Sequence, residues 1–345
     1  MNKILIIKPS GIGDIVHSLP VAFGLKEIFK DCKIHWVVFS KFKGILENFA
    51  YVDKVILWDR NGGIKEYLRL IKELKAQKYD LIVDLQVLLR TSFLGYVVSR
   101  KKVISTSFVR EFSHIFVTPV AKFDPNLHAV ERNYQVVEYL AAKNNKKVHT
   151  PKEFLPWIKI TEEENFFAKK LLDFKEENKY IIFSISSRGE HKIWHYENFV
   201  SLIFKLKKSF LNIIPVFVGS NTELQVVQQA TKQLDNFKIP YINLTGKTTL
   251  RQLCAVVNNC VLTISNDNGV AHISAAMDKP TLILFGPSSP KWFYPYNDNS
   301  GYIYKPIKCS PCGIKTSCKN NICMKQITVE EVYNYVLEKF SKYLQ

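Results

Sequence analysis

The sequence predicts an α/β fold with two parallel sheets, and three observations support this. Short apolar strands and amphipathic helices alternate along almost the whole chain, which is typical of parallel sheets covered by helices. The alternation starts again near residue 179, after a segment at 145–160 in which Asn, Lys and Pro accumulate. A chain of 345 residues is also long enough for two ordinary domains. We therefore expect two βα domains whose strand ends face a central cleft.

The first domain is expected at residues 1–155. Runs of apolar and β-branched residues predict its strands near 3–8, 33–39, 54–58, 79–84 and 102–105. Apolar positions three or four residues apart predict its helices near 14–29, 63–77, 88–99 and 127–144.

The second domain is expected at residues 156–325 and begins with a predicted helix near 161–174. Its strands are predicted near 179–185, 213–219, 240–244, 261–265 and 280–286. Its helices are predicted near 195–209, 221–235, 248–258 and 269–277. Residues 326–345 are expected to form a C-terminal helix that packs back on the first domain.

The composition indicates a globular protein with an anionic partner. Its 48 Lys and Arg residues outnumber its 31 Asp and Glu residues, and the formal net charge is +17. Clustered cations are typical of contact with phosphorylated substrates or anionic lipid headgroups, although a solvated Lys-rich surface explains the charge equally well. Two segments without acidic residues hold the cations Arg90, Arg100, Lys101, Lys102 and Arg110, and then Lys305, Lys308, Lys315, Lys319 and Lys325.

Other classes of partner and location lack support in the sequence. The chain has no recognisable nucleic-acid-binding motif, so no nucleic acid partner is expected. No apolar stretch approaches the roughly 18 residues that span a bilayer, and the start of the chain lacks the pattern of a secretory signal. We expect a monomer in the cytoplasm.

The most informative segment is the turn at 266–272, which follows the predicted strand at 261–265 and opens the predicted helix at 269–277. The first N–H groups of a helix have no partner within the helix and lie at the positive end of its dipole. This turn therefore predicts a phosphate-binding site.

Two further turns between a strand and a helix have residues suited to a ligand. The turn at 9–14 contains two glycines, which allow a ligand to approach the backbone closely, and it places Asp14 at the start of a helix. The turn at 186–194 carries hydroxyl groups, an Arg and a Lys, which suit a diphosphate. We expect the turns at 9–14 and 266–272 to face one cleft, because ligands of α/β domains lie at the carboxyl ends of the strands.

Six segments together form a more specific pattern. They are Gly11–Pro20, Gln86–Arg90, His128–Arg132, Ser186–Trp194, Gly219–Glu223 and Asp267–His272. This set resembles glycosyltransferase family 9, the lipopolysaccharide heptosyltransferases, and within it the first two segments are most similar to heptosyltransferase I. The resemblance implies a GT-B fold of two Rossmann-like domains, with the acceptor on the first domain and a nucleotide-sugar on the second. It also implies inverting transfer without a metal or another cofactor.

The family resemblance implies roles for individual residues. Asp14 would be the general base that removes a proton from the acceptor hydroxyl. Lys192 would hold the diphosphate and offset the charge of the leaving group. The acceptor would be bound by Arg90 and Arg132. The donor would be bound by Gly13, Ser186, Ser187, Lys192, Glu223, Asp267, Asn268, Gly269 and His272.

The resemblance also implies the substrates. The donor would be ADP-heptose, with L-glycero-D-manno-heptose as the sugar, and the acceptor would be Kdo-lipid A or the core oligosaccharide. Such an enzyme would lie at the inner membrane, where its basic residues would contact the anionic surface. Transfer of another sugar, or to another acceptor, is the alternative within the family.

Each of these roles has an alternative. Asp14 is equally suited to cap its helix, and His272 to pack with satisfied hydrogen bonds. Arg90 and Arg132 either bind acidic groups or only cover a helix face. An NAD-dependent oxidoreductase is disfavoured because the third glycine of its turn is missing and residues 39–41 contain no acid. A noncatalytic polyanion-binding protein would need the basic segments but not Asp14.

The C-terminal part contains four closely spaced cysteines, Cys309, Cys312, Cys318 and Cys323, which depart from the pattern of heptosyltransferase I. They are candidates for a structural zinc cluster, although their spacing is irregular. Free thiols are the main alternative, because disulfides are disfavoured in a reducing cytoplasm.

Overall fold

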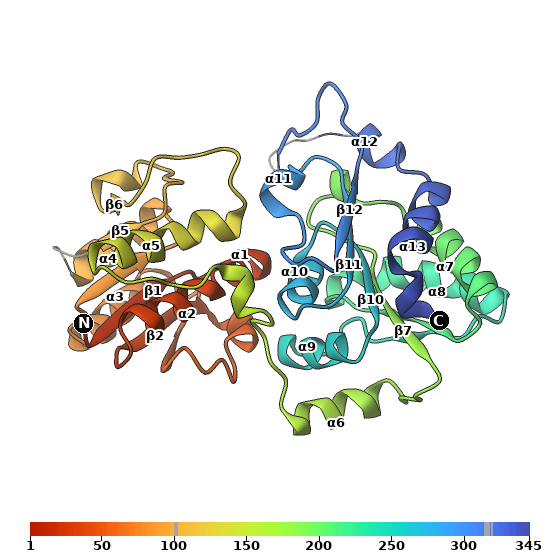
Figure 1. Cartoon of the computed structure of the whole chain (residues 1–345), viewed down its shortest axis with the longest axis horizontal. Helices are drawn as coiled ribbons and strands as arrows, with labels where there is room; N and C mark the ends of the chain where they lie inside the picture. Colours follow the sequence, from red (N-terminus) through yellow and green to blue (C-terminus); the bar gives the residue numbers. More distant parts are fainter. Residues whose placement is uncertain (100–102, 314–317, 319) are drawn as a thin grey trace. The chain divides into compact units, whose positions relative to one another are not determined.

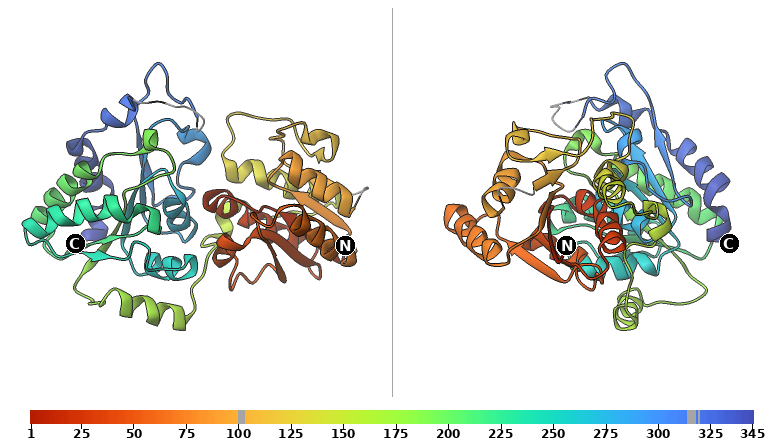
Figure 2. Two further views of the ribbon diagram at one scale, coloured as in Figure 1. Left: turned by 180° about the vertical axis from the view of Figure 1, so that it is seen from behind. Right: turned by 60° about the vertical axis from the view of Figure 1, so that its left-hand side comes forward.

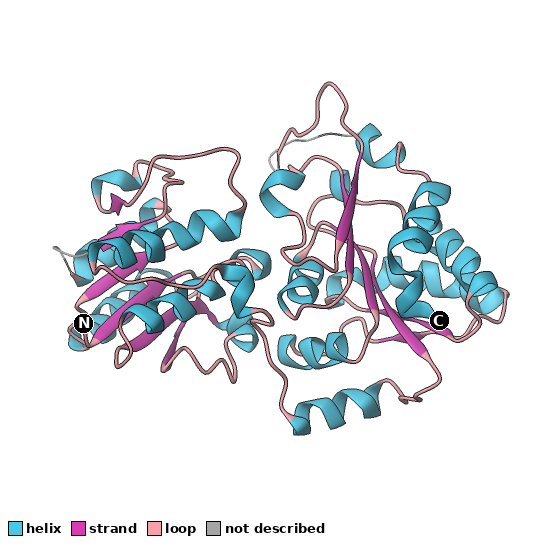
Figure 3. Ribbon diagram, in the orientation of Figure 1, coloured by secondary structure: helices cyan, strands magenta, loops and turns pink. Residues whose placement is uncertain are grey.

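The computed structural model describes residues 1–99, 103–313, 318 and 320–345. The chain divides into two compact units at 1–157 and 158–345. Figure 3 shows that each unit gathers its strands into one sheet with helices around it. The α/β class with two parallel sheets is confirmed, because every strand pair in both sheets is parallel.

The first unit contains a six-stranded sheet with the order β3-β2-β1-β4-β5-β6. Its strands are β1 Lys3–Ile7, β2 Lys33–Phe39, β3 Lys54–Trp58, β4 Leu81–Asp84, β5 Val103–Ser105 and β6 Thr118–Pro119. Its helices are α1 Ile12–Val16, α2 Leu19–Ile28, η1 Ser40–Ile45, α3 Gly63–Ala76, α4 Leu89–Val98, η2 Ser113–Ile115, α5 Ala129–Lys143 and η3 Pro151–Phe154. Helix α2 packs with α5, and α3 packs with α4 (Figure 1).

The second unit contains a six-stranded sheet with the order β12-β11-β10-β7-β8-β9. Its strands are β7 Lys179–Ser184, β8 Ile213–Phe217, β9 Ile242–Asn243, β10 Leu262–Asn266, β11 Thr281–Phe285 and β12 Gly301–Tyr304. Its helices are α6 Glu162–Leu171, η4 Glu190–Lys192, α7 Tyr196–Ser209, η5 Asn221–Glu223, α8 Leu224–Asn236, α9 Leu250–Asn258, α10 Gly269–Ala276, α11 Pro290–Phe293, α12 Ile322–Lys325 and α13 Val329–Leu344.

Both sheets have the strand order of a Rossmann-type fold, since the order of the second, read from β9, repeats that of the first. The direction of winding changes between β1 and β4 in the first unit and between β7 and β10 in the second. Ligands of such sheets bind at the carboxyl ends of the strands beside this switch point. The turns at 9–14, 186–194 and 266–272 follow β1, β7 and β10, so all three start at switch points.

The central strands form the core of each unit. Residues 4–7 of β1 and all of β10 are buried, which is typical of parallel strands covered on both faces. No helix in the described part of the chain is both long and apolar enough to cross a membrane.

The C-terminal helix differs from the expectation for residues 326–345. Helix α13 belongs to the second unit and packs on α7, as Figure 2 also shows, rather than packing back on the first domain. Its side chains Val332, Val336, Phe340 and Leu344 recur every four residues and enter the core of that unit. The apolar stripe was readable in the sequence, but the surface that covers it was not.

Other predicted elements need smaller corrections. The helix expected at 14–29 consists of α1 and α2, and Pro20 lies in the first turn of α2, where a missing N–H costs nothing. The short strands β6 and β12 were not predicted. The division between the units follows Trp157, two residues beyond the expected end of the first domain. Lys102, the predicted start of β5, lies outside the described residues.

Candidate active site

The loops that follow β7 and β10 are joined at the switch point of the second unit. The side chain of Asn266 donates to the carbonyl oxygen of Ile185 at 2.8 Å and accepts from the backbone N–H of Trp194 at 2.9 Å. The hydroxyl of Ser187 donates to the carbonyl oxygen of Asp267 at 2.7 Å. Asn266 is fully buried, and its two hydrogen bonds hold these loops together.

The centre of this site is a buried ion pair. Lys192 Nζ lies 2.6 Å from Asp267 Oδ2, and the hydroxyl of Ser288 donates to the same oxygen at 2.6 Å. His272 Nε2 lies 3.5 Å from the other carboxylate oxygen, Oδ1. Burial alone would raise the pKa of Asp267, but the hydrogen bond from His272 and the charge of Lys192 hold it well below its usual range. Asp267 is therefore ionised and holds the ammonium group in place.

Asn268 links the ion pair to the start of α10. Its Oδ1 accepts from the backbone N–H of Val270 at 3.0 Å and so caps the helix. Its Nδ2 donates to the hydroxyl of Ser184 at 2.9 Å and to the carbonyl oxygen of Ser186 at 2.7 Å. Gly269 is the first residue of the helix. The positive end of the α10 dipole thus lies two residues after Asp267 in the chain. The N-terminus of a helix is suited to binding a phosphate.

The loop that carries Lys192 requires a glycine. Gly189 has a φ of +99°, and a Cβ at this position would lie 2.7 Å from Cε1 of His191. Residues with side chains rarely adopt this conformation, and a Cβ would also require the His191 ring to move. Gly189 thus starts the short helix η4 that ends at the buried Lys192.

Glu223 lies in η5, which follows β8, the strand beside β7 in the sheet. Its carboxylate accepts from the backbone N–H of Ser220 at 2.5 Å and closes a capping box. This contact gives Glu223 a structural role, and contact with the donor stays a prediction.

Gly13 and Asp14 lie in α1 of the first unit. The other predicted donor residues belong to the second unit. Asp14 is exposed at the carboxyl end of β1. Gly11 has a φ of +81°, and its hypothetical Cβ would collide with the Asp14 carboxylate. The positive φ and this close approach explain the glycine.

Lys8 is a buried lysine that the sequence analysis did not single out. Its Nζ donates to the carbonyl oxygen of Leu85 at 2.8 Å. Burial lowers the pKa of Lys8, while the negative charge of Asp14 opposes this effect. The side chain of Lys8 therefore lies near enough to Asp14 for the two to interact electrostatically.

Asp84 is a second buried residue that the predictions missed, at the end of β4. Its carboxylate accepts from the backbone N–H groups of Gln86 and Val87, both at 3.0 Å, and from the hydroxyls of Thr91 at 3.1 Å and Ser92 at 2.7 Å. Burial raises the pKa of Asp84, and these hydrogen bonds oppose the rise. They also hold Val87 at a φ of +49°, a rare conformation for a β-branched residue. An Asp at the end of an apolar strand was the available signal.

Arg90 and Arg132 have different surroundings within the first unit. The guanidinium of Arg90 lies over the ring of Trp58, 4.2 Å from its centroid. Arg132 is buried and lies 5.4 Å from the ring centroid of Phe108 and 5.7 Å from that of Phe123. Burial lowers the pKa of Arg132. Both side chains pack on aromatic rings, and their contact with an acceptor stays a prediction.

The four cysteines of the C-terminal part differ in their exposure. Cys309, Cys312 and Cys318 are exposed, and Cys323 is buried. Among the described residues, no group of three or more His, Cys, Asp and Glu side chains is arranged to hold a metal ion. Lys315 and Lys319, between these cysteines, lie outside the described residues, as do Arg100 and Lys101.

Sequence comparisons support one family. The model of "Glycosyltransferase family 9 (heptosyltransferase)" matches residues 67–322. The lipopolysaccharide core heptosyltransferase OpsX of Haemophilus influenzae is 27% identical over 345 residues, which cover 96% of this chain and 95% of the relative. The lipopolysaccharide heptosyltransferase 1 of Campylobacter coli is 25% identical and is matched over 98% of this chain and 99% of the relative.

Solved structures support the same fold. A family 9 glycosyltransferase from Veillonella parvula superimposes with a TM-score of 0.82 at 24% identity, covering 99% of this chain and 97% of that one. The E. coli heptosyltransferase WaaC with ADP gives a TM-score of 0.74 at 22% identity, covering 98% and 99%.

The two Rossmann-type units and these structural relatives show that the chain has the GT-B fold. More narrowly, the chain belongs to glycosyltransferase family 9, the heptosyltransferases.

Proposed function

We propose that this enzyme transfers heptose from ADP-L-glycero-D-manno-heptose to the Kdo or inner-core region of lipopolysaccharide. The observation that carries the proposal is the buried Lys192–Asp267 pair beside the start of α10, with Ser186 and Ser187 in the adjoining loop. A lysine held at a helix N-terminus is suited to a diphosphate. The named activity of the relatives from H. influenzae and C. coli, and the ADP bound to the E. coli enzyme, support this choice of substrates.

The proposed reaction is a single displacement without a metal. Asp14 takes the proton of the acceptor hydroxyl as that oxygen forms a bond to the anomeric carbon. The bond between this carbon and the diphosphate oxygen breaks, and ADP leaves with the electron pair. Attack from the side opposite the leaving group inverts the anomeric configuration. Lys192 and the N–H groups of α10 stabilise the charge that develops on the diphosphate.

The proposal extends to location and partners. We propose a monomer that acts in the cytoplasm and contacts the anionic surface of the inner membrane, because a lipid-linked acceptor has its phosphates there and the chain has a net charge of +17. Some cations of the two basic segments have partners within the fold: Lys305 lies 2.6 Å from Glu331, and Arg110 donates to the carbonyl oxygen of Gln86 at 3.0 Å. The remaining cations of these segments would contact the anionic membrane surface.

A thermal-shift series with ADP, ADP-heptose, UDP-sugars and NAD tests the donor. A ligand present at 100 times its Kd stabilises the folded protein by about 2.7 kcal/mol, so each true ligand gives a measurable shift. We expect shifts with ADP and ADP-heptose only. A shift with NAD alone would favour the oxidoreductase, and binding of ADP-heptose without transfer to a lipopolysaccharide acceptor would contradict the proposed reaction.

A further inference from the structure

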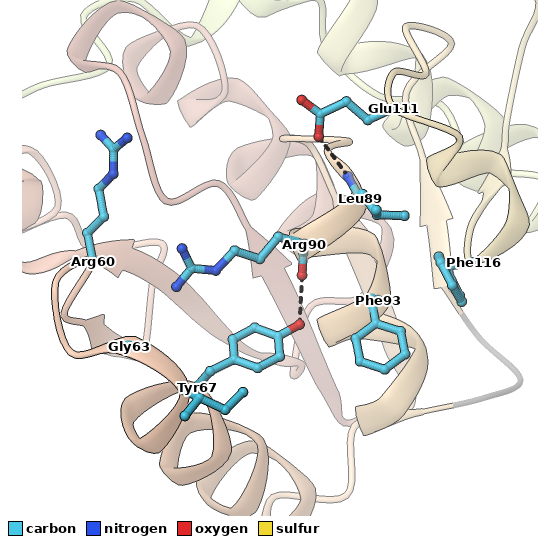
Figure 4. A pocket seen from close by; sticks show the side chains of 9 residues that line it. Arg60, Gly63, Tyr67, Leu89, Arg90, Phe93, Glu111 and Phe116 are labelled. Carbon is cyan, nitrogen blue, oxygen red and sulfur yellow. Dashed lines mark hydrogen bonds between the residues drawn. The ribbon is translucent and has the colours of Figure 1, made fainter.

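The first unit contains a pocket of about 680 Å³ between α3, α4 and the segment 111–116. Figure 4 shows the side chains that line it. Its lining is largely apolar and includes Ile64, Leu89, Phe93 and Phe116. The rings of Phe93 and Phe116 meet edge to face, with centroids 5.3 Å apart. This pocket contains none of the residues assigned above to the donor or to the base, but its lining includes Arg90, which is predicted to bind the acceptor.

The surface around the pocket is also apolar. Ile64 is 68% exposed, and Leu68, one turn further along α3, is more than half exposed. Phe112 and Ile115 protrude from the loop beside the pocket, and Phe112 is 76% exposed. Single exposed apolar side chains are ordinary, but a group of them around an apolar hollow is typical of a surface that binds something.

The loop beside the pocket has a strained backbone at Glu111 and at the exposed Phe112. Glu111 and Phe112 have φ values of +54° and +56°, and two successive residues with side chains rarely adopt the left-handed region. The loop is held there by two contacts: Glu111 Oε2 accepts from the backbone N–H of Leu89 at 3.3 Å, and the hydroxyl of Ser113 donates to the carbonyl oxygen of Val87. The fold thus maintains an unfavourable backbone that presents an aromatic ring to solvent.

Two cations accompany the apolar lining. In Figure 4 the guanidinium groups of Arg60 and Arg90 lie on one side, and the rings of Phe93 and Phe116 lie on the other. The hydroxyl of Tyr67 donates to the carbonyl oxygen of Arg90 at 2.8 Å and fixes the start of α4 against α3. One lining group, Glu111, is acidic, but its carboxylate is engaged at the N-terminus of α4. An apolar hollow with cations at one side complements a molecule with an acyl chain and an anionic headgroup.

We propose that Ile64, Leu68, Leu89, Phe93, Phe112 and Ile115 form an apolar surface that docks the enzyme on a bilayer of anionic phospholipid. The pocket receives an acyl chain, and Arg60 and Arg90 bind lipid phosphates. This inference rests on the proposed membrane contact and assigns it to defined residues. Apolar insertion together with electrostatic attraction is the combination by which peripheral proteins bind membranes.

Co-sedimentation with vesicles tests the proposal. The wild-type enzyme should bind vesicles of equimolar phosphatidylglycerol and phosphatidylcholine, and bind phosphatidylcholine alone more weakly. The double variant Ile64→Asp/Leu68→Asp changes two exposed side chains of α3 and should lower the partition coefficient at least about tenfold, since large apolar groups no longer leave water. Arg60→Glu should weaken binding to the anionic vesicles only.

The matched control is Phe166→Asp/Leu211→Asp, which changes two exposed apolar side chains of the second unit. It should alter vesicle binding by less than about twofold, as is usual for surface substitutions. If Ile64→Asp/Leu68→Asp binds the anionic vesicles as well as the control does, the docking proposal is wrong. The same holds if that variant loses only self-association, which would assign the surface to a second copy of the chain.

Two further measurements separate this inference from the proposed function. The ADP-induced thermal shift and turnover on a deacylated, water-soluble acceptor should be unchanged in Ile64→Asp/Leu68→Asp. If turnover falls only with the acylated acceptor in detergent while vesicle binding is normal, the pocket binds the chains of the acceptor and the docking proposal fails. If the wild-type enzyme shows no turnover with ADP-heptose, the proposed function fails, and the vesicle assay still decides the docking site.

Discussion

The buried Lys192–Asp267 pair offers the sharpest test of the site, because removing either partner leaves the other charge without its main compensation. Both side chains are about 90% buried, with 9% and 10% exposed. Loss of one partner of such a pair typically costs about 3–5 kcal/mol. In Lys192→Ala, Ser288 and His272 still contact the carboxylate, so we expect the lower end, about 3 kcal/mol. For a domain of this size, that corresponds to a fall in Tm of about 6–12 °C.

A double-mutant cycle isolates the interaction. Urea unfolding of wild type, Lys192→Ala, Asp267→Ala and the double variant should give a coupling free energy of at least about 1 kcal/mol. Lys205→Ala is the matched control, because Lys205 pairs with Glu330 on the surface of the same unit and such pairs contribute at most about 1 kcal/mol. A coupling below about 0.5 kcal/mol would refute the buried pair.

The pH dependence of the same pair gives a second readout. The folded-state pKa of Asp267 is depressed, so its contribution to stability is complete above the ordinary carboxyl pKa of about 4 and is lost as the pH falls from there toward the depressed value. In Lys192→Ala the pKa should rise, because burial then has less opposition. The stability difference between wild type and Lys192→Ala should therefore narrow on acidification, and a difference that widens would contradict this assignment.

Three further predictions concern catalysis and the acceptor. Asp14→Asn should lower turnover at least about 10²-fold with unchanged ADP affinity, because it removes the base and keeps the shape; wild-type turnover in a steady-state assay would exclude Asp14 as the base. Gly11→Ala should lower turnover without weakening ADP binding, because the added Cβ would displace the Asp14 carboxylate. A turnover rate equal to that of the wild type would show that the position of this carboxylate does not matter. Raising ionic strength from about 0.05 to 0.5 M should raise the KM for lipid acceptor more than that for donor, and charge reversal of Arg100, Lys101 and Lys102 should have the same effect. Equal salt responses for both substrates, with normal vesicle binding by the triple variant, would leave these cations a purely solubilising role.

The sequence by itself determined the fold class and the positions of the ligand turns. Alternating strand and helix patterns are local signals, and each turn lies between two such patterns, so 186–194 and 266–272 were recognisable without knowledge of the fold. The motifs also led to Lys192 and Asp267 as separate candidates. Their direct contact at 2.6 Å was not predicted, because it joins residues 75 positions apart.

Only the tertiary structure decided what surrounds each residue. Ser288, the partner of Asp267 in the loop after β11, carries no local sequence signal, and the same is true of the Leu85 carbonyl group that accepts from Lys8. The apolar stripe of α13 was readable, but its packing on α7 depended on which surface was left uncovered. Local periodicity determines which face of an element is apolar, whereas long-range packing selects the neighbour of that face. The Lys192–Asp267 ion pair, the pocket of the first unit and the position of α13 could therefore be recognised only in the folded chain.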